Sequence, residues 1–167
     1  LVGDSNEISQ PVQDAIQATL KRGIPVAIAT GRMYNSALYF HSVLGSKMPL
    51  VAYNGAWIQN PHSGERFQHL PVPQTLALQL LDHLEHPELR SQLGVHCYLE
   101  DQLYVREITS ETERYAERSR VKAQKVPDLR KILQESPTKI LAMSQDQGVI
   151  RQLLDNLPQH FSPQDLH

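Results

Sequence analysis

The chain has 167 residues, enough for one ordinary domain or for a small domain plus part of another, since domains commonly run to about 100 to 200 residues. Hydrophobic residues make up 40% and charged residues 20%, a balance typical of globular rather than disordered proteins. The formal net charge of -2 and the pI near 6.5 provide no basic field for a phosphate backbone, so we expect no nucleic-acid partner.

The single cysteine and the lack of a long apolar run indicate the compartment. Cys97 cannot form an internal disulfide, which is typical of a reducing compartment. No run approaches the roughly 20 apolar residues that span a bilayer, and no signal peptide opens the chain. We expect a cytoplasmic protein with no membrane partner. Because residues 1–5 carry no initiator Met and residues 161–167 complete no element, we also expect a fragment.

A helix, a strand and a second helix come first in the chain. Residues 9–21 have the apolar period of a helix and carry Pro in the first turn. Residues 24–29 (IPVAIA) are continuously apolar, which is typical of a parallel strand buried on both faces. Residues 35–44 predict the second helix. The polar turn 30–32 lies between this strand and this helix.

A second strand and a hairpin follow. Residues 49–53 predict another apolar strand, which ends at the turn signal Asn54-Gly55. Residues 56–59 and 66–70 flank a short polar turn and predict an antiparallel hairpin. We therefore interpret residues 1–70 as part of an open parallel sheet with helices, an α/β architecture.

Residues 71–167 have a different pattern, which predicts an α+β unit with antiparallel strands. The boundary follows from Pro71 and Pro73, after which a new helical pattern begins. The expected elements are a helix from 76 to 84, a hairpin of 95–99 and 103–105 joined by Glu100, Asp101 and Gln102, a helix from Ser110 to about 118 with Glu113 completing a capping box, a helix over 128–135, a strand over 139–143, and a last helix opened by Ser144 and Gln147 as a second capping box.

Polar residues follow both predicted strands of the first region. In open α/β sheets, ligands bind at the carboxyl ends of the strands, where this sequence places Thr30-Gly31-Arg32 and Asn54-Gly55. A Thr hydroxyl and backbone N–H groups bind phosphate oxygens, Gly allows close approach, and Arg adds positive charge. The alternative is a plain turn that caps the next helix. From the residues alone, both interpretations stay open.

The order of several short strings identifies a family. They are EIS at 7–9, AI at 15–16, GIPVAIATGR at 23–32, YNGA at 53–56, YLEDQLYV at 98–105 and PTKIL at 137–141. Together they closely resemble the Cof-type branch (subfamily IIB) of the haloacid dehalogenase (HAD) superfamily. Each string is weak alone, but the ordered combination is specific and covers nearly the whole chain.

The resemblance implies a Rossmann-like core with an inserted C2B cap domain, and Mg²⁺-dependent hydrolysis of phosphomonoesters, often of sugars. On this basis residues 1–70 are part of the core and residues 71–167 most of the cap. Thr30 matches the family's second motif, whose hydroxyl binds the transferring phosphoryl group. Arg32 and Asn54 match positions near the substrate, and we group Gly31 and Gly55 with them as substrate-binding residues.

The resemblance also implies that the other three motifs lie outside this chain. The first motif supplies the aspartate nucleophile and the general acid and base, and Leu1 matches its last residue. The third motif's Lys and the fourth motif's metal-binding Asp pair would follow His167. Asp4 stands after the first motif in a Gly-Asp-Ser turn, so we do not expect it to replace the nucleophile. We expect the Mg²⁺ ligands outside this chain and the segment alone to be inactive.

Other polar residues give weaker signals. His83 and His86 form no metal-ligand pattern and are expected at the solvated surface. Cys97 alternates with apolar neighbours and is expected to be a buried structural thiol. Residues 100–102 either face the leaving group or form a plain exposed turn.

Three functional hypotheses result. The first is a Mg²⁺-dependent phosphatase of small phosphorylated metabolites, with sugar phosphates as the expected substrates. The second is a non-catalytic module that binds a phosphorylated ligand through Thr30 and Arg32, or that mediates interactions through the cap. The third is an unrelated Rossmann-like nucleotide binder, against which the absence of a Gly-rich loop argues.

Overall fold

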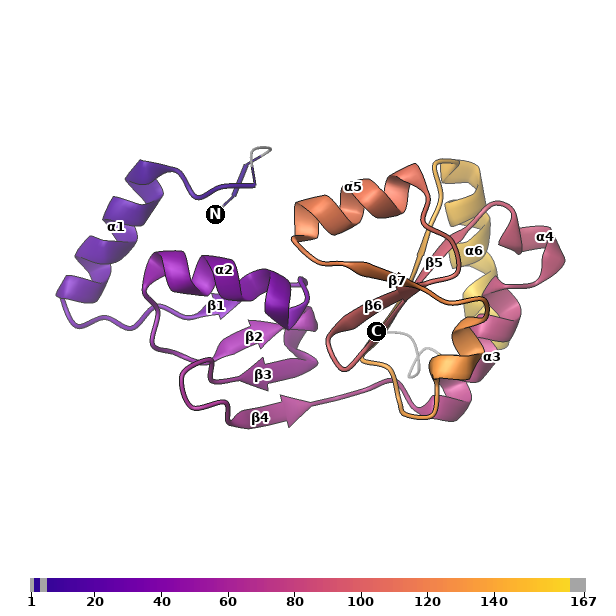
Figure 1. Ribbon diagram of the computed structural model, residues 1–167, viewed down its shortest axis with the longest axis horizontal. Coiled ribbons are helices and arrows are strands. Elements are labelled where there is room, and N and C mark those ends of the chain that lie inside the picture. The colour runs from indigo at the N-terminus through magenta and orange to yellow at the C-terminus, as the bar shows by residue number, and fades with distance from the viewer. Residues whose placement is uncertain (1, 4–5, 163–167) are drawn as a thin grey trace. The chain divides into compact units, whose positions relative to one another are not determined.

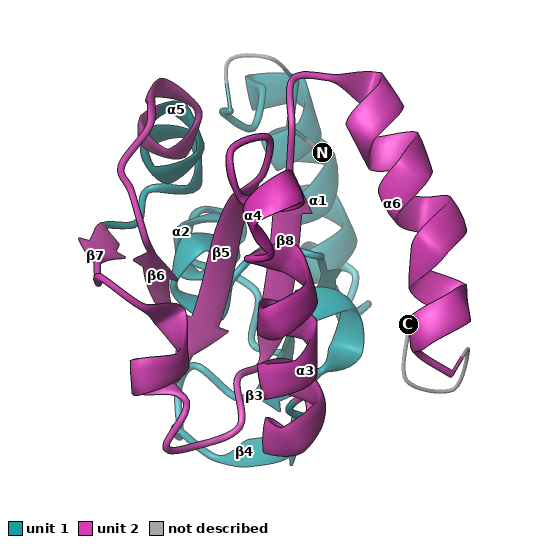
Figure 2. Cartoon of the chain, turned by 90° about the vertical axis from the view of Figure 1, so that its right-hand side faces the viewer, with its two compact units in different colours: residues 1–71, 114–122 teal, residues 72–113, 123–167 magenta. Residues whose placement is uncertain are grey.

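The computed structural model describes residues 2–3 and 6–162, so Leu1 and Asp4, two positions of the sequence interpretation, lie outside the described residues. The chain divides into two compact units, coloured separately in Figure 2. The first contains residues 1–71 and 114–122, and the second contains residues 72–113 and 123–167.

The first unit contains a mixed sheet of four strands and two long helices (Figure 1). The first two strands pair in parallel, and the other two neighbouring pairs are antiparallel. The expected α/β character and the expected hairpin are therefore confirmed. In sheet order the strands are β1 (Ile28–Ala29), β2 (Leu50–Ala52), β3 (Trp57–Gln59) and β4 (Arg66–His69); the helices are α1 (Gln10–Lys21) and α2 (Tyr34–Leu44).

Helix α2 supplies most of the first unit's helical packing. It buries Ala37, Phe40 and Leu44, and Gly45 ends it in the left-handed conformation at φ 65°. Helix α1, in contrast, has no buried residue in the structure. The helix that follows β1 therefore supplies the buried helical face of this unit, and it packs against β2.

The strand predicted over residues 24–29 is shorter and more exposed than expected. Only Ile28–Ala29 is a strand, and Ile24 is 53% exposed. Within the described residues, β1 pairs on one side only, with β2, and α1 buries none of its apolar stripe. The prediction of burial on both faces is wrong for this structure, because Ile28 faces the interior whereas Ala29, on the other face of the strand, stays exposed.

The second unit contains a four-stranded sheet in the order β7-β6-β5-β8. Strand β5 lies inside this sheet and pairs antiparallel with both of its neighbours, which confirms the antiparallel hairpin. The elements of this unit are α3 (Gln74–Leu84), α4 (Pro87–Arg90), β5 (Gly94–Leu99), β6 (Gln102–Val105), β7 (Ala123–Lys125), η2 (Leu129–Ile132), β8 (Lys139–Met143) and α6 (Gln147–His160). Helix α5 (Ser110–Ser119) is divided between the two units, with residues 110–113 in the second and residues 114–119 in the first.

One face of this second sheet packs into an apolar cluster with α3 and α6. Val95 and Cys97 of β5 join Leu81 of α3 and Leu153 of α6 there. Cys97 is fully buried, and burial raises the pKa of its thiol to about 12. The prediction of a buried structural thiol is confirmed.

Both predicted capping boxes are displaced. Helix α5 is capped by Thr109, whose Oγ1 accepts a hydrogen bond from the backbone N–H of Thr112 at 3.2 Å. Helix α6 is capped by Asp146, whose Oδ1 accepts from Gly148 N–H at 2.7 Å. The predictions of Ser110 and Ser144 are wrong because an equally good cap residue one or two positions away fits the observed helix start.

The helix predicted over 128–135 is a 3₁₀ turn at Leu129–Ile132, capped by Asp128 through Arg130 N–H at 3.0 Å. Its length of 4 residues is typical of such turns. Two short elements, α4 and β7, had no sequence signal. Of the helices in the described part of the chain, none is both long and apolar enough to cross a membrane.

Candidate functional site

The structure brings the two predicted turns together at the carboxyl ends of β1 and β2. Thr30 N–H donates to the Val51 carbonyl at 2.9 Å, continuing the parallel pairing beyond β1. Asn54 N–H then donates to the Thr30 carbonyl at 3.0 Å, and Tyr53 N–H donates to the Arg32 carbonyl at 2.9 Å. The last two hydrogen bonds join residues 30–32 to residues 53–55, a pair of loops that we call the strand-tip crossing.

The second loop of the crossing has an unusual backbone. Tyr53, Asn54 and Gly55 all have positive φ, at 50°, 55° and 102°. Asn and Gly adopt this region readily, whereas for Tyr it costs about 1 to 3 kcal/mol and requires support from the surroundings. That support comes from the buried ring of Tyr53, which is 5% exposed and packs 6.2 Å from the ring of Trp57. The turn therefore presents an exposed Asn54 on a fixed backbone.

Gly31 is the point where the two loops approach most closely. A Cβ atom at this position would lie 2.7 Å from Oδ1 of Asn54 and 3.4 Å from its Nδ2. Real Cβ contacts are essentially never below 3.0 Å, so any side chain here displaces the Asn54 carboxamide. Gly31 thus allows the carboxamide to lie directly against the Thr30-Arg32 backbone.

Thr30 is oriented by its own loop. Its Oγ1 accepts a hydrogen bond from Arg32 N–H at 3.2 Å, and the residue is partly buried. A hydroxyl that accepts in this way keeps its proton for donation. Helix α2 begins a few residues later, and its N-cap Met33 makes no side-chain cap. The positive end of the helix dipole at this helix start favours an anion.

The guanidinium of Arg32 lies toward Asn6 and helix α2. Its Nη2 donates to Asn6 Oδ1 at 2.6 Å, and its Nη1 donates to Ser36 Oγ and to the Arg118 carbonyl, both at 3.4 Å. It also lies 4.9 Å from the centre of the Phe40 ring. Sequence reasoning missed Asn6 and Ser36, because neither lies in a recognisable motif.

The electrostatic setting of Arg32 is positive. Burial is the main cause that lowers the pKa of its guanidinium, and the charge of Arg118 is the next. Within the same unit, Arg120 pairs with Glu7 and lies over the Tyr39 ring at 3.6 Å. Arg120 is therefore partly compensated by a carboxylate, whereas the groups that contact Arg32 are neutral.

The predicted hairpin turn of the second unit is tight. Glu100 and Asp101 have φ of 44° and 57°, a two-residue turn that matches the twist of its strands. Glu100 is exposed, whereas Asp101 is only 6% exposed. A plain exposed turn therefore describes Glu100 but not Asp101. A role of residues 100–102 toward a leaving group stays a prediction.

His83, in α3, and His86, just after the end of this helix, differ in solvent exposure. The side chain of His86 is 59% exposed, as expected. His83 is partly buried, with its ring centre 4.9 Å from that of His160, and burial followed by repulsion from His160 lowers its pKa. The prediction of a solvated His83 is wrong because the end of α6 covers one side of the ring. No cluster of three or more His, Cys, Asp or Glu that could hold a metal occurs among the residues that the structure describes.

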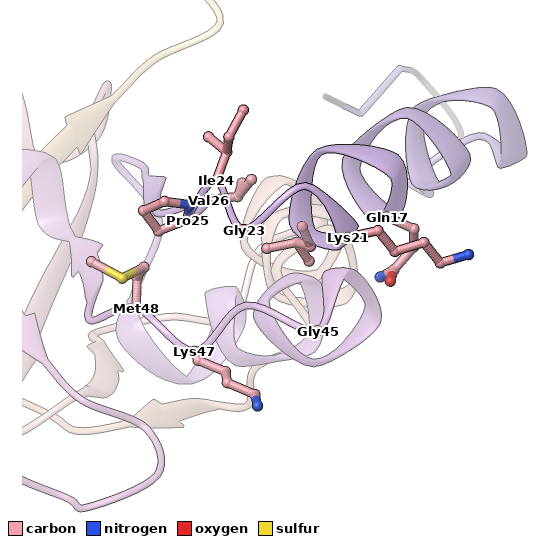
Figure 3. Close-up of a pocket in the computed structure, with 10 residues that line it drawn as sticks. Gln17, Lys21, Gly23, Ile24, Pro25, Val26, Gly45, Lys47 and Met48 are labelled. Carbon is pink, nitrogen blue, oxygen red and sulfur yellow. The ribbon is translucent and has the colours of Figure 1, made fainter.

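A groove of about 450 Å³ lies elsewhere in the first unit (Figure 3). It borders the segment that leads into β1, whereas the strand-tip crossing follows β1. Its lining is mostly apolar, with lysines from two segments: Gln17, Leu20, Lys21, Gly23, Ile24, Pro25, Val26, Gly45, Lys47 and Met48. None of these residues belongs to the crossing, so the groove and the candidate site are separate features.

Comparison with known proteins assigns the chain to a family. The family model of haloacid dehalogenase-like hydrolases matches residues 1–165. The chain belongs to this family. Its relatives include 5-amino-6-(5-phospho-D-ribitylamino)uracil phosphatase YitU of Bacillus subtilis, which is 27% identical over 166 residues. That alignment covers 94% of this chain and 58% of YitU. The expected membership of the haloacid dehalogenase superfamily is thereby confirmed.

Solved structures share the fold. TM0651 from Thermotoga maritima matches with a TM-score of 0.78 and 25% identity, over 98% of this chain and 59% of that one. The HAD subclass IIB sugar phosphatase BT4131 matches with a TM-score of 0.71 and 14% identity, over 91% and 57% of the two chains. This haloacid dehalogenase-like chain thus spans somewhat less than two thirds of the length of these proteins.

Proposed function

We propose that the full-length protein hydrolyses phosphomonoesters of small metabolites, with sugar phosphates as the substrate class. The observation that carries this proposal is the strand-tip crossing, where Thr30, Gly31 and Asn54 meet. Two relatives support the substrate class by what they are: YitU acts on a phosphorylated ribityl compound, and BT4131 is a sugar phosphatase.

The crossing is suited to bind a phosphoryl group. The Thr30 hydroxyl would donate to a phosphoryl oxygen, and Gly31 leaves room for its close approach. The carboxamide of Asn54 offers a further N–H donor on the other loop. Arg32 would add positive charge, and Gly55 allows the left-handed turn that places Asn54. Donors fixed in advance stabilise charge that develops on a transferring group.

The proposed route passes through an aspartyl-phosphate, for which this chain supplies binding rather than the nucleophile. We expect the nucleophilic aspartate, the general acid and base and the Mg²⁺ ligands outside the chain, and the chain alone to be inactive. When bound, Mg²⁺ would neutralise negative charge on the phosphoryl oxygens. In the same proposal, residues 1–70 belong to the catalytic core and residues 71–167 to a cap that selects the substrate.

The second candidate is a module that binds a phosphorylated ligand without hydrolysing it. The contacts described for Thr30, Arg32 and Asn54 involve neutral partners, so the described part of the crossing offers donors but no nucleophile. An Asp-x-Asp stretch upstream of Leu1 in the same reading frame would rule this candidate out. A start codon immediately before Leu1 would favour it.

The test of the proposed function is a kinetic comparison in the full-length protein with Mg²⁺ and a panel of sugar phosphates. Thr30→Ala removes the hydroxyl, whereas Thr30→Ser keeps it and serves as the matched control. We expect Thr30→Ala to lose about 2 to 4 kcal/mol of transition-state stabilisation in kcat/KM, the cost of one oxyanion donor. Thr30→Ser should retain most of the activity. Equal turnover in wild type and Thr30→Ala would refute the assigned role.

A further inference from the structure

The guanidinium of Arg32 is held in place by contacts that, in the described part of the chain, involve only neutral groups. Among the described residues, its hydrogen-bond partners are the Asn6 carboxamide, the Ser36 hydroxyl and the Arg118 carbonyl. The fourth contact is the face of the Phe40 ring, at 4.9 Å. A guanidinium bound by neutral groups keeps its full charge for an anion, whereas one paired with a carboxylate has largely lost it.

Asn6 makes the shortest of these contacts. Its Oδ1 lies 2.6 Å from Arg32 Nη2, while the two Nη1 contacts are both 3.4 Å long. Its other side-chain atom, Nδ2, donates to the Arg118 carbonyl at 2.7 Å. Both ends of the carboxamide are therefore used, which fixes the orientation of the amide group as well as its position.

The backbone of Asn6 is also fixed. It has a positive φ of 57°, a conformation that Asn tolerates better than most residues, and its N–H donates to the Gly3 carbonyl at 3.1 Å. The side chain therefore starts from a defined backbone conformation at Asn6 itself. Asn6, Arg32, Ser36 and Arg118 all belong to the first compact unit.

We infer that Asn6 is a positioning residue for Arg32, which it holds beside the Thr30 turn with its charge available to the phosphate of the substrate. The inference rests on the proposed function, because it assumes that the strand-tip crossing binds a phosphoryl group. Its physical content is an aligned, charge-assisted hydrogen bond that orders a flexible cation before the anion arrives.

The plain alternative is that Asn6 is only a turn residue with a positive φ. Two substitutions separate the two roles. Asn6→Gly keeps the turn, because Gly adopts positive φ without cost, but removes the carboxamide. Asn6→Asp keeps the shape and the acceptor oxygen but places a negative charge 2.6 Å from Arg32, where it competes with the anion. Asn60→Asp is the matched control, because it adds the same charge in the β3–β4 hairpin. There, Asn60 Oδ1 accepts a hydrogen bond from His62 N–H at 2.9 Å.

The experiment titrates the full-length proteins with inorganic phosphate by calorimetry and measures kcat and KM for one sugar phosphate. We expect Asn6→Gly to weaken phosphate binding about ten-fold, the effect of one hydrogen bond to a charged group. Asn6→Asp should weaken it by about ten-fold or more, with the loss mainly in KM, and Asn60→Asp should stay within about two-fold of wild type. A turn residue alone would leave Asn6→Gly at the wild-type value.

The outcomes are distinguishable. If wild type hydrolyses sugar phosphates while both Asn6 variants keep the wild-type phosphate affinity and KM, the positioning role is overturned and the proposed function stands. If wild type binds phosphate but hydrolyses no ester, the proposed function fails, and the affinity series still decides the role of Asn6. If wild type binds no phosphate, both proposals are overturned.

Discussion

The candidate site in the first unit and the interior of the second unit are held by different interactions. In the first unit, β1 has two residues, and the apolar segment that leads into it is largely exposed. The strand-tip crossing that follows β1 is held by backbone hydrogen bonds between two loops. In the second unit, β5 lies between two neighbours and one of its faces is packed in an apolar cluster. A small number of directional hydrogen bonds holds the candidate site, whereas many non-directional contacts stabilise the second unit.

This difference predicts where substitutions act. In the first unit, a change at the crossing should affect binding and turnover more than stability, because little apolar area is involved. In the second unit, a change in the cluster should affect the free energy of unfolding, because packed interiors tolerate the loss of even a few methyl groups poorly.

The largest expected effect is on stability and comes from Leu81→Ala in α3. Leu81 is 0% exposed and lies in the apolar cluster, so truncation should cost about 2 to 5 kcal/mol of unfolding free energy. Leu20→Ala is the matched change in α1, a helix with no buried residue, and should cost less than about 1 kcal/mol. Urea denaturation measures both. Equal costs would contradict the contrast between the units.

The next effect is on activity and comes from Gly31→Ala. Its Cβ would meet Asn54 Oδ1 at 2.7 Å, so the carboxamide must shift by a few tenths of an ångström, and we expect kcat/KM to fall by about ten-fold. Gly94→Ala in β5 is the control, since its Cβ would lie 3.9 Å from the Met143 carbonyl, an ordinary contact. Kinetics of the full-length proteins measure the difference. Wild-type kcat/KM in Gly31→Ala would show that the close approach is not needed.

The last effect appears only at low pH and concerns the other face of the second sheet, where His96 is fully buried, with its Nε2 3.2 Å from Oγ1 of Thr112 in α5. Burial, followed by the charge of Lys139, lowers the pKa of His96 from 6.5 to about 4. As the pH falls below about 6.5, His96 is therefore protonated in the unfolded chain but stays neutral in the folded chain. The free energy of unfolding decreases until about pH 4, where the folded chain also binds the proton. The linkage is worth about 2 to 3 kcal/mol.

Replacing His96 separates its contribution to the pH dependence of stability from that of the carboxylates, which also titrate at low pH. The difference in unfolding free energy between wild type and His96→Gln should change between pH 7 and pH 4, with wild type losing more. His86→Gln, at an exposed position, should show no such change. A pH-independent difference for His96→Gln would mean that the folded protein accepts the proton.

The sequence predicted those parts of the fold that depend on local patterns. Helices α2 and α6 follow from apolar periodicity, and the β5–β6 hairpin follows from alternation and a short polar turn. Caps were predicted less well, because Ser, Thr and Asp are nearly equivalent at a helix start. Tertiary contacts select between them, as they do at Asp146.

For the candidate site, the two turns could be predicted because parallel strands end at the same edge of a sheet. Their contact through Gly31 and Asn54 could not, since it depends on three consecutive positive φ values that begin at Tyr53. The position of Asn6 beside Arg32 was equally hidden, because it joins residues 26 positions apart and no local pattern records such a contact. Local sequence patterns predict the loops, whereas the contacts between the loops depend on the tertiary fold.

The most direct test of the central claim is a phosphate titration followed by amide NMR on the full-length protein. The account predicts that the backbone N–H signals of Thr30, Gly31 and Arg32 shift together with those of Asn54 and Gly55, and that all five follow one Kd. Shifts in only one of the two loops, or two different Kd values, would contradict a single phosphoryl group bound by both strand tips.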